Sequence, residues 1–501
     1  MDPMTAPLIE LRHLGKSFGA VRALEDVSLA IGRGEIHCLA GENGSGKSTL
    51  IKVISGIWQP DRGEILIDGR PVHGLTPREA IAHGVQVIYQ DFSLFGNLSV
   101  AENLALSNEL HEGRKLVSWG RVRRIAREAI GKLGVDLDLD ALVETLPTAG
   151  KQLVAIARAL MSDPRLLIMD EPTTALTGRE VEALFRVVRD IQSRGIAVLF
   201  VSHKMREMLE ISERLTVIRS GRVVAAGPIR EFDEAKITRA MTGQEIAAEG
   251  YRWEGRPGQQ PLLEVSGLTV PGEIEDVSLR VMPGEIVGIS GLLGSGRTEL
   301  ALALFGMKPD YAGSIRLEGR EVRLGSVQAA IAEGIAYVPE DRLTEGLFLT
   351  QTIDRNMLAT SHDRLSRFGV VQGGQAAREA AAMIREMAIA TPTGNRPVTQ
   401  LSGGNAQRVV IGRWLMNDPK LLILNGPTVG VDVGSKAGIH RKIRELARAR
   451  GLGVLMISDD LPELVDNCNR ILVLHRGRLV SEVATAETSE AALSAQLGAL
   501  A

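Results

Sequence analysis

The sequence predicts two α/β domains in tandem, each built around a mostly parallel β-sheet. Its 501 residues are about twice the length that one ordinary core accommodates. The chain also repeats itself, because Gly34–Ile36 recurs at an offset of 250 residues as Gly284–Ile286. Within each copy, short apolar runs alternate with helical patterns, which is typical of parallel strands joined by helices.

The repeat extends over most of the chain and therefore indicates a domain duplication. The glycine-rich segment Gly41–Ser48 recurs as Gly291–Thr298 at the same offset of 250 residues, and the apolar run Leu166–Asp170 recurs as Leu421–Asn425 at an offset of 255. Insertions of about five residues separate the copies in between. A period this long is far beyond that of any solenoid repeat.

Glycine, proline and glutamine residues between the two copies predict a short flexible linker. We expect the first domain over residues 1–243, the linker over residues 244–261 and the second domain over residues 262–501.

Composition excludes several classes of protein. The net charge of −3 provides no general polycation for nucleic acid, and Cys38 and Cys468 are too few for a disulfide framework or a zinc cluster. No run approaches the ~18 apolar residues of a membrane span, and Met1–Leu11 lacks the apolar core of a secretory signal. A reducing, cytosolic setting fits these features, so any role at a membrane is expected to come through a partner.

The first chemical motif lies between an expected strand and an expected helix. Glu35–Ala40 is an apolar run, Gly41–Lys47 is a glycine-rich turn and Ser48–Ile57 has helical periodicity, which is the context that a phosphate loop requires. Glycines let successive N–H groups point at a phosphate, and the helix N-terminus adds partial positive charge. Lys47 is placed to reach the β- and γ-phosphate oxygens, and Ser48 is placed to bind Mg²⁺. The predicted phosphate-binding residues are Gly41, Glu42, Asn43, Gly44, Ser45, Gly46, Lys47 and Ser48.

Two carboxylates, Asp170 and Glu171, follow directly after a later apolar strand, Leu166–Met169. In parallel sheets the carboxyl ends of the strands line the ligand crevice. Asp170 suits a Mg²⁺ ion held through water, and Glu171 suits the orientation or deprotonation of an attacking water. His203 follows the expected strand Ile196–Val201, although a lone histidine is most often structural.

Gln90 and Phe18 carry little signal alone, but with the motifs above they complete a pattern that resembles the ATP-binding-cassette (ABC) ATPases. In that resemblance Phe18 is the adenine-stacking aromatic, Gln90 is the Q-loop and His203 is the switch histidine. The signature position is Leu146–Gly150 in the first copy and Leu401–Asn405 in the second, and the Leu-Ser-Gly-Gly-Asn sequence of the second is highly specific to the family. The resemblance covers nearly the whole chain. It implies two tandem P-loop nucleotide-binding domains, each with a mostly parallel core, an antiparallel β subdomain and a helical subdomain.

A narrower resemblance is to the fused double cassettes of bacterial monosaccharide importers of the ribose, galactose and xylose type. It is carried by Gly294–Leu300, Pro339–Arg342 and Gly430–Gly434. It implies ATP and Mg²⁺ as cofactors, two integral-membrane permease subunits and a periplasmic solute-binding protein. It also implies a peripheral place on the cytoplasmic face of the cell membrane. Importers of autoinducer-2, polyols and nucleoside-like solutes belong to the same group, so these solutes stay open as alternatives.

In this family the two cassettes of a chain pair and enclose two ATP molecules head to tail. The resemblance therefore assigns Glu171, His203 and Gln90 to catalysis at the first site, and Ser48, Gln90 and Asp170 to Mg²⁺. The ATP-binding residues that it implies there are Phe18, Gly41–Ser48 and Asp170 of the first domain and Ser402, Gly403, Gly404 and Asp432 of the second.

The substitutions that remove chemistry all fall on the second site. Arg297 replaces the phosphate-loop lysine, Asn425 replaces the magnesium-side aspartate and Gly426 replaces the general base. Loss of a general base alone costs roughly 10²–10⁴-fold in rate, so we expect ATP hydrolysis at one site only. The other altered positions of the second site are Glu340, Asp459, Thr177, Pro147 and Ala149.

The main alternative is a soluble tandem-cassette ATPase that acts on ribosomes. Such factors usually carry a long charged linker and two intact sites, whereas this chain has a short linker and one depleted site. The sequence therefore favours a transport ATPase without a nucleic-acid partner.

Overall fold

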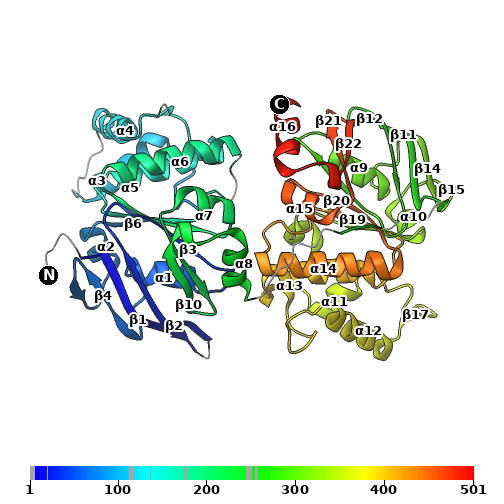
Figure 1. The fold of residues 1–501 in the computed structure, drawn as a ribbon, viewed down its shortest axis with the longest axis horizontal. Coiled ribbons are helices and arrows are strands. Elements are labelled where there is room, and N and C mark those ends of the chain that lie inside the picture. The colour runs from blue at the N-terminus through cyan, green and yellow to red at the C-terminus, as the bar shows by residue number, and fades with distance from the viewer. Residues whose placement is uncertain are drawn as a thin grey trace. The chain divides into compact units, whose positions relative to one another are not determined.

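The computed structural model describes residues 6–19, 21–111, 118–135, 137–173, 176, 178–243, 251–253, 255 and 258–500. The chain divides into two compact units, Met1–Ile246 and Ala247–Ala501 (Figure 1). Each unit has an antiparallel sheet, a mostly parallel sheet and a group of helices, which confirms the predicted fold. Within the described part of the chain, no helix is both long enough and apolar enough to cross a bilayer.

The first unit begins with an antiparallel sheet in the order β2-β1-β4-β5. Successive side chains of a strand point to opposite faces, so Ile9 and Leu11 are buried while Glu10 and Arg12 form an ion pair on the other face. The buried face shares its core with the first helix, α1 (Lys47–Ile54). The strands of this sheet are β2 (Val21–Ile31), β1 (Ile9–Phe18), β4 (Arg62–Ile67) and β5 (Arg70–Val72).

The main sheet of the first unit has the order β10-β9-β3-β8-β7-β6, and only the edge strand β10 is antiparallel to its neighbour. Both faces are covered, which explains the continuous apolar runs. Leu166 and Ile168 face the core under the antiparallel sheet, whereas Leu167 and Met169 face the helices. The strands are β10 (Arg222–Pro228), β9 (Arg214–Arg219), β3 (Ile36–Ala40), β8 (Ala197–Ser202), β7 (Leu166–Asp170) and β6 (Val85–Ile88).

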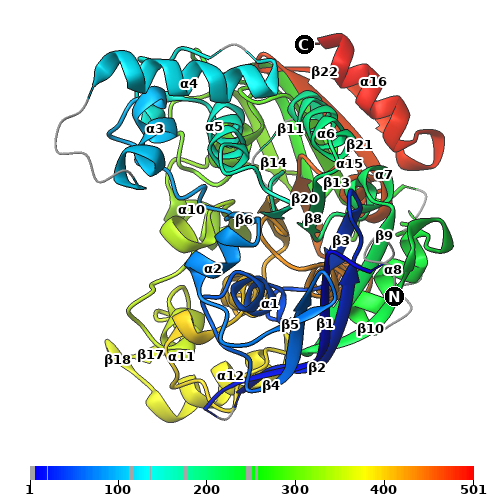
Figure 2. The same cartoon turned by 90° about the vertical axis from the view of Figure 1, so that its left-hand side faces the viewer.

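Helices α3, α4 and α5 of the first unit pack together, away from the antiparallel sheet (Figures 1 and 2). Helix α4 is amphipathic, because Val122, Ile125, Ala129 and Leu133 recur at helical spacing on its buried face. Besides α1, the helices are α2 (Pro77–Ala82), α3 (Val100–His111), α4 (Trp119–Leu133), α5 (Thr148–Leu160), α6 (Gly178–Ser193), α7 (Met205–Ile211) and α8 (Glu234–Thr242).

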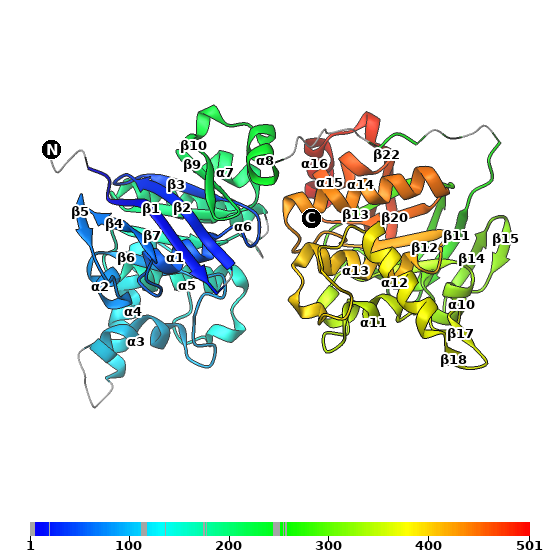
Figure 3. The same cartoon turned by 90° about the horizontal axis from the view of Figure 1, so that it is seen from below.

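The two larger sheets of the second unit, which is drawn in Figure 3, repeat the strand orders of the first unit. Its antiparallel sheet has the order β12-β11-β14-β15, and its main sheet has the order β16-β19-β20-β13-β21-β22. The strands are β11 (Leu263–Val270), β12 (Ile274–Val281), β13 (Ile286–Gly291), β14 (Ala312–Leu317), β15 (Arg320–Val322), β16 (Ile335–Val338), β19 (Leu421–Asn425), β20 (Gly453–Ile457), β21 (Arg470–His475) and β22 (Arg478–Ala484), with a small hairpin of β17 (Ser366–Arg367) and β18 (Val370–Val371). The helices are α9 (Arg297–Leu304), α10 (Val327–Ala332), α11 (Ile353–Leu358), α12 (Gly373–Glu386), α13 (Gly403–Leu415), α14 (Val433–Arg450), α15 (Leu461–Asn467) and α16 (Glu490–Leu500).

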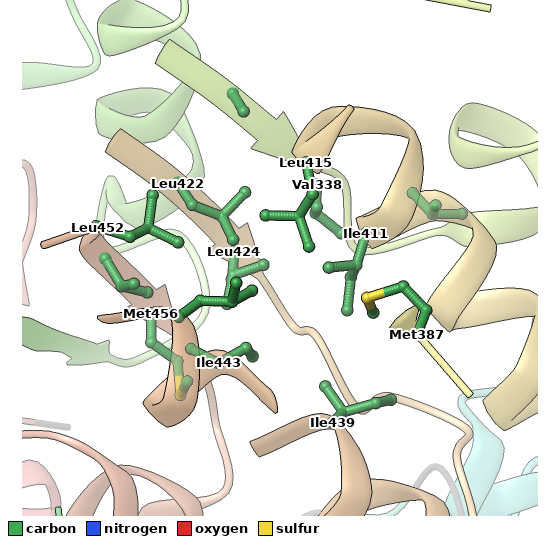
Figure 4. Close-up of a cluster of buried hydrophobic side chains, with 14 of the residues drawn as sticks. Val338, Met387, Ile411, Leu415, Leu422, Leu424, Ile439, Ile443, Leu452 and Met456 are labelled. Carbon is green, nitrogen blue, oxygen red and sulfur yellow. The ribbon is translucent and has the colours of Figure 1, made fainter. Parts of the chain in front are cut away.

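A continuous apolar core joins the main sheet of the second unit to its helices. Figure 4 shows Leu422 and Leu424 of β19 among Ile411 of α13 and Ile439 and Ile443 of α14. This packing fixes the carboxyl end of β19 relative to the N-termini of both helices, which is where the predicted signature and its neighbours lie.

Part of the predicted linker is attached to the second unit. The Tyr251 hydroxyl donates to the Gly284 carbonyl oxygen at 2.7 Å, and Trp253 Nε1 donates to the Pro283 carbonyl oxygen at 3.1 Å. Tyr251 is buried. The glycine and proline content of this segment gave no hint of these anchors, and residues 244–250 lie outside the described part of the chain.

Candidate nucleotide site

The loop between β3 and α1 is a tight turn that depends on glycine. Gly46 has a φ of 112°, and a Cβ at this residue would lie 2.6 Å from the Ala23 carbonyl oxygen, so a side chain is excluded. The Ser45 N–H donates to the Glu42 carbonyl oxygen at 3.1 Å. The Ser45 hydroxyl is buried without a hydrogen-bond partner. A bound ligand would satisfy this polar group.

Lys47 lies over this loop. Its Nζ donates to the carbonyl oxygens of Gly41 at 2.7 Å and Glu42 at 3.1 Å, and the residue is only 6% exposed. The next residue of α1, Ser48, is exposed, so its hydroxyl is accessible to a ligand. An ammonium beside a turn of backbone N–H groups makes a strong anion site.

Asp170, Glu171 and His203 come together at the carboxyl ends of β7 and β8. Glu171 Oε1 lies 3.1 Å from His203 Nδ1, a hydrogen-bond distance. The φ of Glu171 is 50°, in the left-handed region that costs a side-chain-bearing residue about 1–3 kcal/mol. Burial and the adjacent Glu171 charge raise the pKa of Asp170, while Lys47 opposes the shift. This half-buried pair of carboxylates is stabilised by a nearby cation.

A buried carboxylate behind these residues fixes the two loops that carry them. Glu207 Oε2 accepts hydrogen bonds from Thr173 Oγ1 at 2.6 Å and from Ser202 Oγ at 3.0 Å. Thr173 follows the carboxylate pair in the chain, and Ser202 directly precedes His203. Glu207 therefore sets the distance between the general-base candidate and the histidine, a role that the sequence motifs missed.

The second unit contains the corresponding hydrogen bonds around Glu463. The sequence repeat could therefore have identified Glu207, because Glu463 stands at the equivalent position. Glu463 accepts hydrogen bonds from Thr428 Oγ1 at 2.6 Å and from Ser458 Oγ, and it lies 2.9 Å from His440 Nε2. Burial opposes ionisation of Glu463, but hydrogen bonds from His440, Ser458 and Thr428 lower its pKa to about 2. The two networks are related by offsets of 255 and 256 residues.

Phe18 and Gln90 are both exposed, on separate elements of the first unit. The Phe18 ring is 41% exposed and lies 4.6 Å from the Trp58 ring, centroid to centroid. The β1–β2 hairpin that carries Phe18 also touches the phosphate loop, through Ala23 beside Gly46. A supported, accessible ring at this position is suited to stacking on a base. Gln90 is exposed on the turn after β6, the strand next to β7.

In the second unit the predicted signature turn lies against the start of α14. Ser402 precedes α13, and its hydroxyl accepts a hydrogen bond from Asn405 Nδ2 at 2.9 Å. A Cβ at Gly404 would collide with the Ser435 side chain and lie 3.4 Å from Asp432 Oδ2. Asp432 in turn caps α14, because its Oδ1 accepts from the Ser435 N–H at 2.8 Å. Glycine at 404 thus allows the signature turn and Asp432 to sit together.

Arg342, which the motifs did not assign, fastens this cluster. Its guanidinium donates to the carbonyl oxygens of Val429 at 2.6 Å and Gly430 at 3.1 Å, on the loop that leads to Asp432. A Cβ at Gly403 would lie 3.0 Å from Arg342 Nη2. One side chain therefore holds the signature turn and the Asp432 loop in register.

The phosphate loop of the second unit is surrounded by different chemistry. Arg297 makes an ion pair with Asp459, the residue at the switch-histidine position. Asn425 Nδ2 lies 3.4 Å from both Thr298 Oγ1 and Tyr337 OH. A neutral hydrogen-bonded group therefore occupies the strand end where the first unit has two carboxylates.

The remaining substitutions remove further polar groups. Gly426 has a φ of 56°, close to that of Glu171, and a Cβ there would lie 3.0 Å from Glu340 Cγ. In the first unit, Pro147 stands before α5 where Ser402 stands before α13, and it offers neither a hydroxyl nor an N–H. Thr177 lies outside the described residues.

A divalent cation fits the first unit and not the second. Mg²⁺ takes oxygen ligands, preferably from carboxylates. The first unit offers the accessible Ser48 hydroxyl and the Asp170 carboxylate beside Glu171. The equivalent strand end in the second unit presents the Asn425 amide to the Thr298 hydroxyl.

The two phosphate loops, the carboxylate pair and the signature turn define a nucleotide-hydrolysing cassette, and the chain belongs to the ABC transporter family. The family model matches residues 24–174 and 274–429, one stretch in each unit.

Among curated proteins, the chain is 42% identical to the "Ribose import ATP-binding protein RbsA 2" of Streptomyces avermitilis, over 99% of this chain and 97% of that protein. It is 40% identical to a "Putative ribose/galactose/methyl galactoside import ATP-binding protein 1" of Burkholderia cenocepacia, over 96% of this chain and 92% of that protein. Among solved structures, it is 26% identical to the ADP conformation of an ATP-binding cassette of an ABC transporter, with a TM-score of 0.42 over 47% of this chain and 94% of that chain.

Proposed function

We propose that this chain hydrolyses ATP to energise the import of a monosaccharide through a partner permease. The observation that carries the proposal is the contact of Glu171 with His203, 3.1 Å apart at the same sheet edge as Asp170 and the phosphate loop. Relatives that are named for ribose and galactose import align over almost the whole chain and support the choice of solute.

In the proposed reaction, water attacks the γ-phosphate of ATP held by the first unit. The backbone N–H groups of the loop and Lys47 bind the phosphate oxygens, and Phe18 stacks on the adenine. Ser48, Asp170 and Gln90 are the residues that would hold Mg²⁺, and the ion would neutralise charge on the phosphates. Glu171 accepts the proton of the attacking water, and ADP and phosphate are the products.

Within this mechanism His203 is a positioning residue for Glu171. The hydrogen bond to Glu171 holds the carboxylate in one orientation, and Glu207 holds the loop of His203 through Ser202. Pre-oriented groups lower the barrier because little reorganisation is needed during the reaction.

We further propose that the chain has a single hydrolytic site. The second unit lacks the general base at Gly426 and the magnesium-side carboxylate at Asn425. Its intact contribution is the signature turn at Ser402 with Asp432, which the family resemblance assigns to the ATP of the first unit. Support comes from the assembly of these two groups at the adjacent starts of α13 and α14.

The partners that follow from this function are two permease subunits in the membrane and a periplasmic solute-binding protein. The chain would then be held at the cytoplasmic face of the membrane by the permeases.

Transport assays with a matched inactive variant test the proposal. Cells that lack the gene should lose uptake of radiolabelled ribose or galactose, recover it with the wild-type chain, and fail to recover it with Lys47→Ala. Excess unlabelled polyol or nucleoside should leave uptake unchanged if the solute is a monosaccharide. Normal uptake of both sugars without the gene would exclude the proposed solutes, and co-sedimentation with ribosomes instead of with membranes would exclude transport.

A further inference from the structure

The segment that follows α1 packs against the end of β1, where Phe18 lies. Trp58 belongs to this segment, and it is half-buried against the core beneath the antiparallel sheet. The Trp58 and Phe18 rings lie 4.6 Å apart, centroid to centroid, with an angle of 62° between their planes. This edge-to-face arrangement is a favourable geometry for two aromatic rings. The exposed Phe18 ring therefore rests on a ring that the core holds in place.

Trp58 is in turn attached to the last turn of α1. Its backbone N–H donates to the Lys52 carbonyl oxygen at 3.0 Å, and Lys52 Nζ lies 4.6 Å from the centroid of the Trp58 ring. An ammonium at this distance is attracted to the face of an indole. Because α1 begins at Lys47, one short helix connects the phosphate loop to the support of Phe18.

Asp61 fixes the backbone that carries Phe18. Its carboxylate accepts hydrogen bonds from the Ser17 N–H at 2.7 Å and from Lys16 Nζ at 2.8 Å. The Asp61 N–H donates to the Gly15 carbonyl oxygen at 2.8 Å. These contacts involve the three residues directly before Phe18, so the backbone at the ring is held in position.

The second unit joins the same two segments by different chemistry. Lys308 stands 250 residues after Trp58, at the equivalent position of the repeat. Its Nζ makes an ion pair with Glu273 Oε1 at 2.5 Å, on the turn between β11 and β12. The fold of a cassette is therefore compatible with an ion pair at this place, and the aromatic pair of the first unit calls for a separate explanation.

We propose that Trp58 and Asp61 are positioning residues for Phe18 and thereby set the affinity of the first unit for the base of its nucleotide. Trp58 keeps the Phe18 ring in the orientation that stacking needs, and Asp61 keeps its backbone in place, before the nucleotide arrives. A side chain that is ordered in advance lowers the entropic cost of binding. This inference rests on the proposed ATP site of the first unit and adds two residues that act through Phe18.

Steady-state phosphate release by the full chain tests the role of Trp58. The two substrates are ATP and ribose 5-triphosphate, which has the same sugar and phosphates without the base. Trp58→Leu should raise the KM for ATP by about two- to twelvefold, the range expected when one more side chain must be ordered on binding. The KM for ribose 5-triphosphate and both kcat values should stay within about twofold of the wild type, because only base binding is weakened.

A double-mutant cycle separates this role from general support of the fold. In a Phe18→Ala chain, added Trp58→Leu should not raise the KM for ATP further, as expected for a residue that acts through Phe18. Trp58→Phe should restore most of the affinity, because it keeps a ring against Phe18. The inference would be overturned by an undiminished effect of Trp58→Leu in the Phe18→Ala chain, or by equal increases in KM for both substrates.

Asp61→Asn provides a second variant at an exposed position, where folding is little affected. It should raise the KM for ATP by up to about fivefold, the range of an exposed ion pair, and leave that for ribose 5-triphosphate unchanged. Lys308→Leu is the matched control, since it breaks the equivalent connection in the second unit. An effect of Lys308→Leu as large as that of Trp58→Leu, or no effect of either Trp58→Leu or Asp61→Asn, would contradict the inference.

The wild-type chain distinguishes failure of this inference from failure of the proposed ATP site. Stacking on an aromatic ring strengthens base binding by about 5- to 150-fold, so the wild type should prefer ATP to ribose 5-triphosphate and Phe18→Ala should remove the preference. Equal KM values for the two substrates in the wild type would remove the basis of both proposals. A preference that depends on Phe18 but survives Trp58→Leu undiminished would refute only the role of Trp58.

Discussion

Replacement of Glu171 by glutamine tests where hydrolysis takes place. The change removes the proposed base while keeping the size of the side chain, and the amide can still meet His203 across the 3.1 Å contact. Because glutamine tolerates the φ of 50° no worse than glutamate does, the fold should be unaffected. Loss of a general base predicts a decrease in turnover of roughly 10²–10⁴-fold, or about 2.7–5.4 kcal/mol in the barrier.

ATP binding should survive this substitution. Burial is the largest cause of the raised pKa of Asp170, and the Glu171 charge is the second. Without that charge Asp170 ionises more readily and holds a cation more strongly, so the affinity for ATP should equal or exceed that of the wild type. Phosphate release at saturating ATP and equilibrium binding of labelled ATP separate the two effects. Turnover within tenfold of the wild type would refute the assignment of the base.

Gly426→Glu is the matched change in the second unit. It restores a carboxylate at the equivalent position, yet Asn425 and Asp459 remain, so turnover should barely change. The new side chain would also be strained, because φ is 56° and its Cβ would lie 2.9 Å from Val429 and 3.0 Å from Glu340. A loss of about 1–3 kcal/mol in stability is expected from the backbone alone, and urea unfolding measures it. A large gain in turnover would show that the second site lacked only its base.

Three more outcomes follow from the structure. Glu463→Gln should destabilise the chain by about 3 kcal/mol near neutral pH, because the folded-state pKa of about 2 lies below the unfolded-state value of about 4.3. This contribution to stability is present above the unfolded-state pKa and is lost as the pH falls toward 2. The free energies of unfolding of wild type and variant, measured with urea, should therefore converge in acid. A difference that stays constant with pH would disprove the role of the His440 contact. Asp170→Asn, which copies the second unit, should abolish turnover and the Mg²⁺ dependence of ATP binding, and titration of ATP with and without EDTA checks this. Ser402→Ala should reduce turnover at least tenfold, whereas Thr148→Ala, in the signature position of the first unit, should leave it unchanged. Phosphate-release assays measure both variants, and equal effects would contradict the one-site proposal.

The sequence could nominate candidate residues for the site because most of them lie close together in the chain. A phosphate loop is a single strand–turn–helix, so Gly41–Ser48 identifies itself through local spacing, and Asp170 with Glu171 ends one strand. The contact of Glu171 with His203 was implied only by resemblance, since it depends on which strands are adjacent.

Residues that hold the candidate site residues in place were not predictable in this way. Glu207 is an ordinary acidic residue of a helix in the sequence, and only the packing of α7 beneath two loops turns it into the acceptor for Thr173 and Ser202. Arg342 and Tyr251 are similar cases, because their partners lie 88 and 33 residues away in the chain.

The sequence by itself determined that the protein is duplicated, which half has the carboxylate pair Asp170-Glu171 where the other has Asn425-Gly426, and which family it joins. These properties depend on local sequence patterns and on the recurrence of those patterns along the chain. Only the tertiary structure decided that the Asp459 carboxylate pairs with Arg297, that Glu207 joins two loops of the first unit and that Arg342 fastens the signature turn to the Asp432 loop. Those facts depend on distances between segments far apart in the chain, and such distances arise from packing rather than from any local pattern.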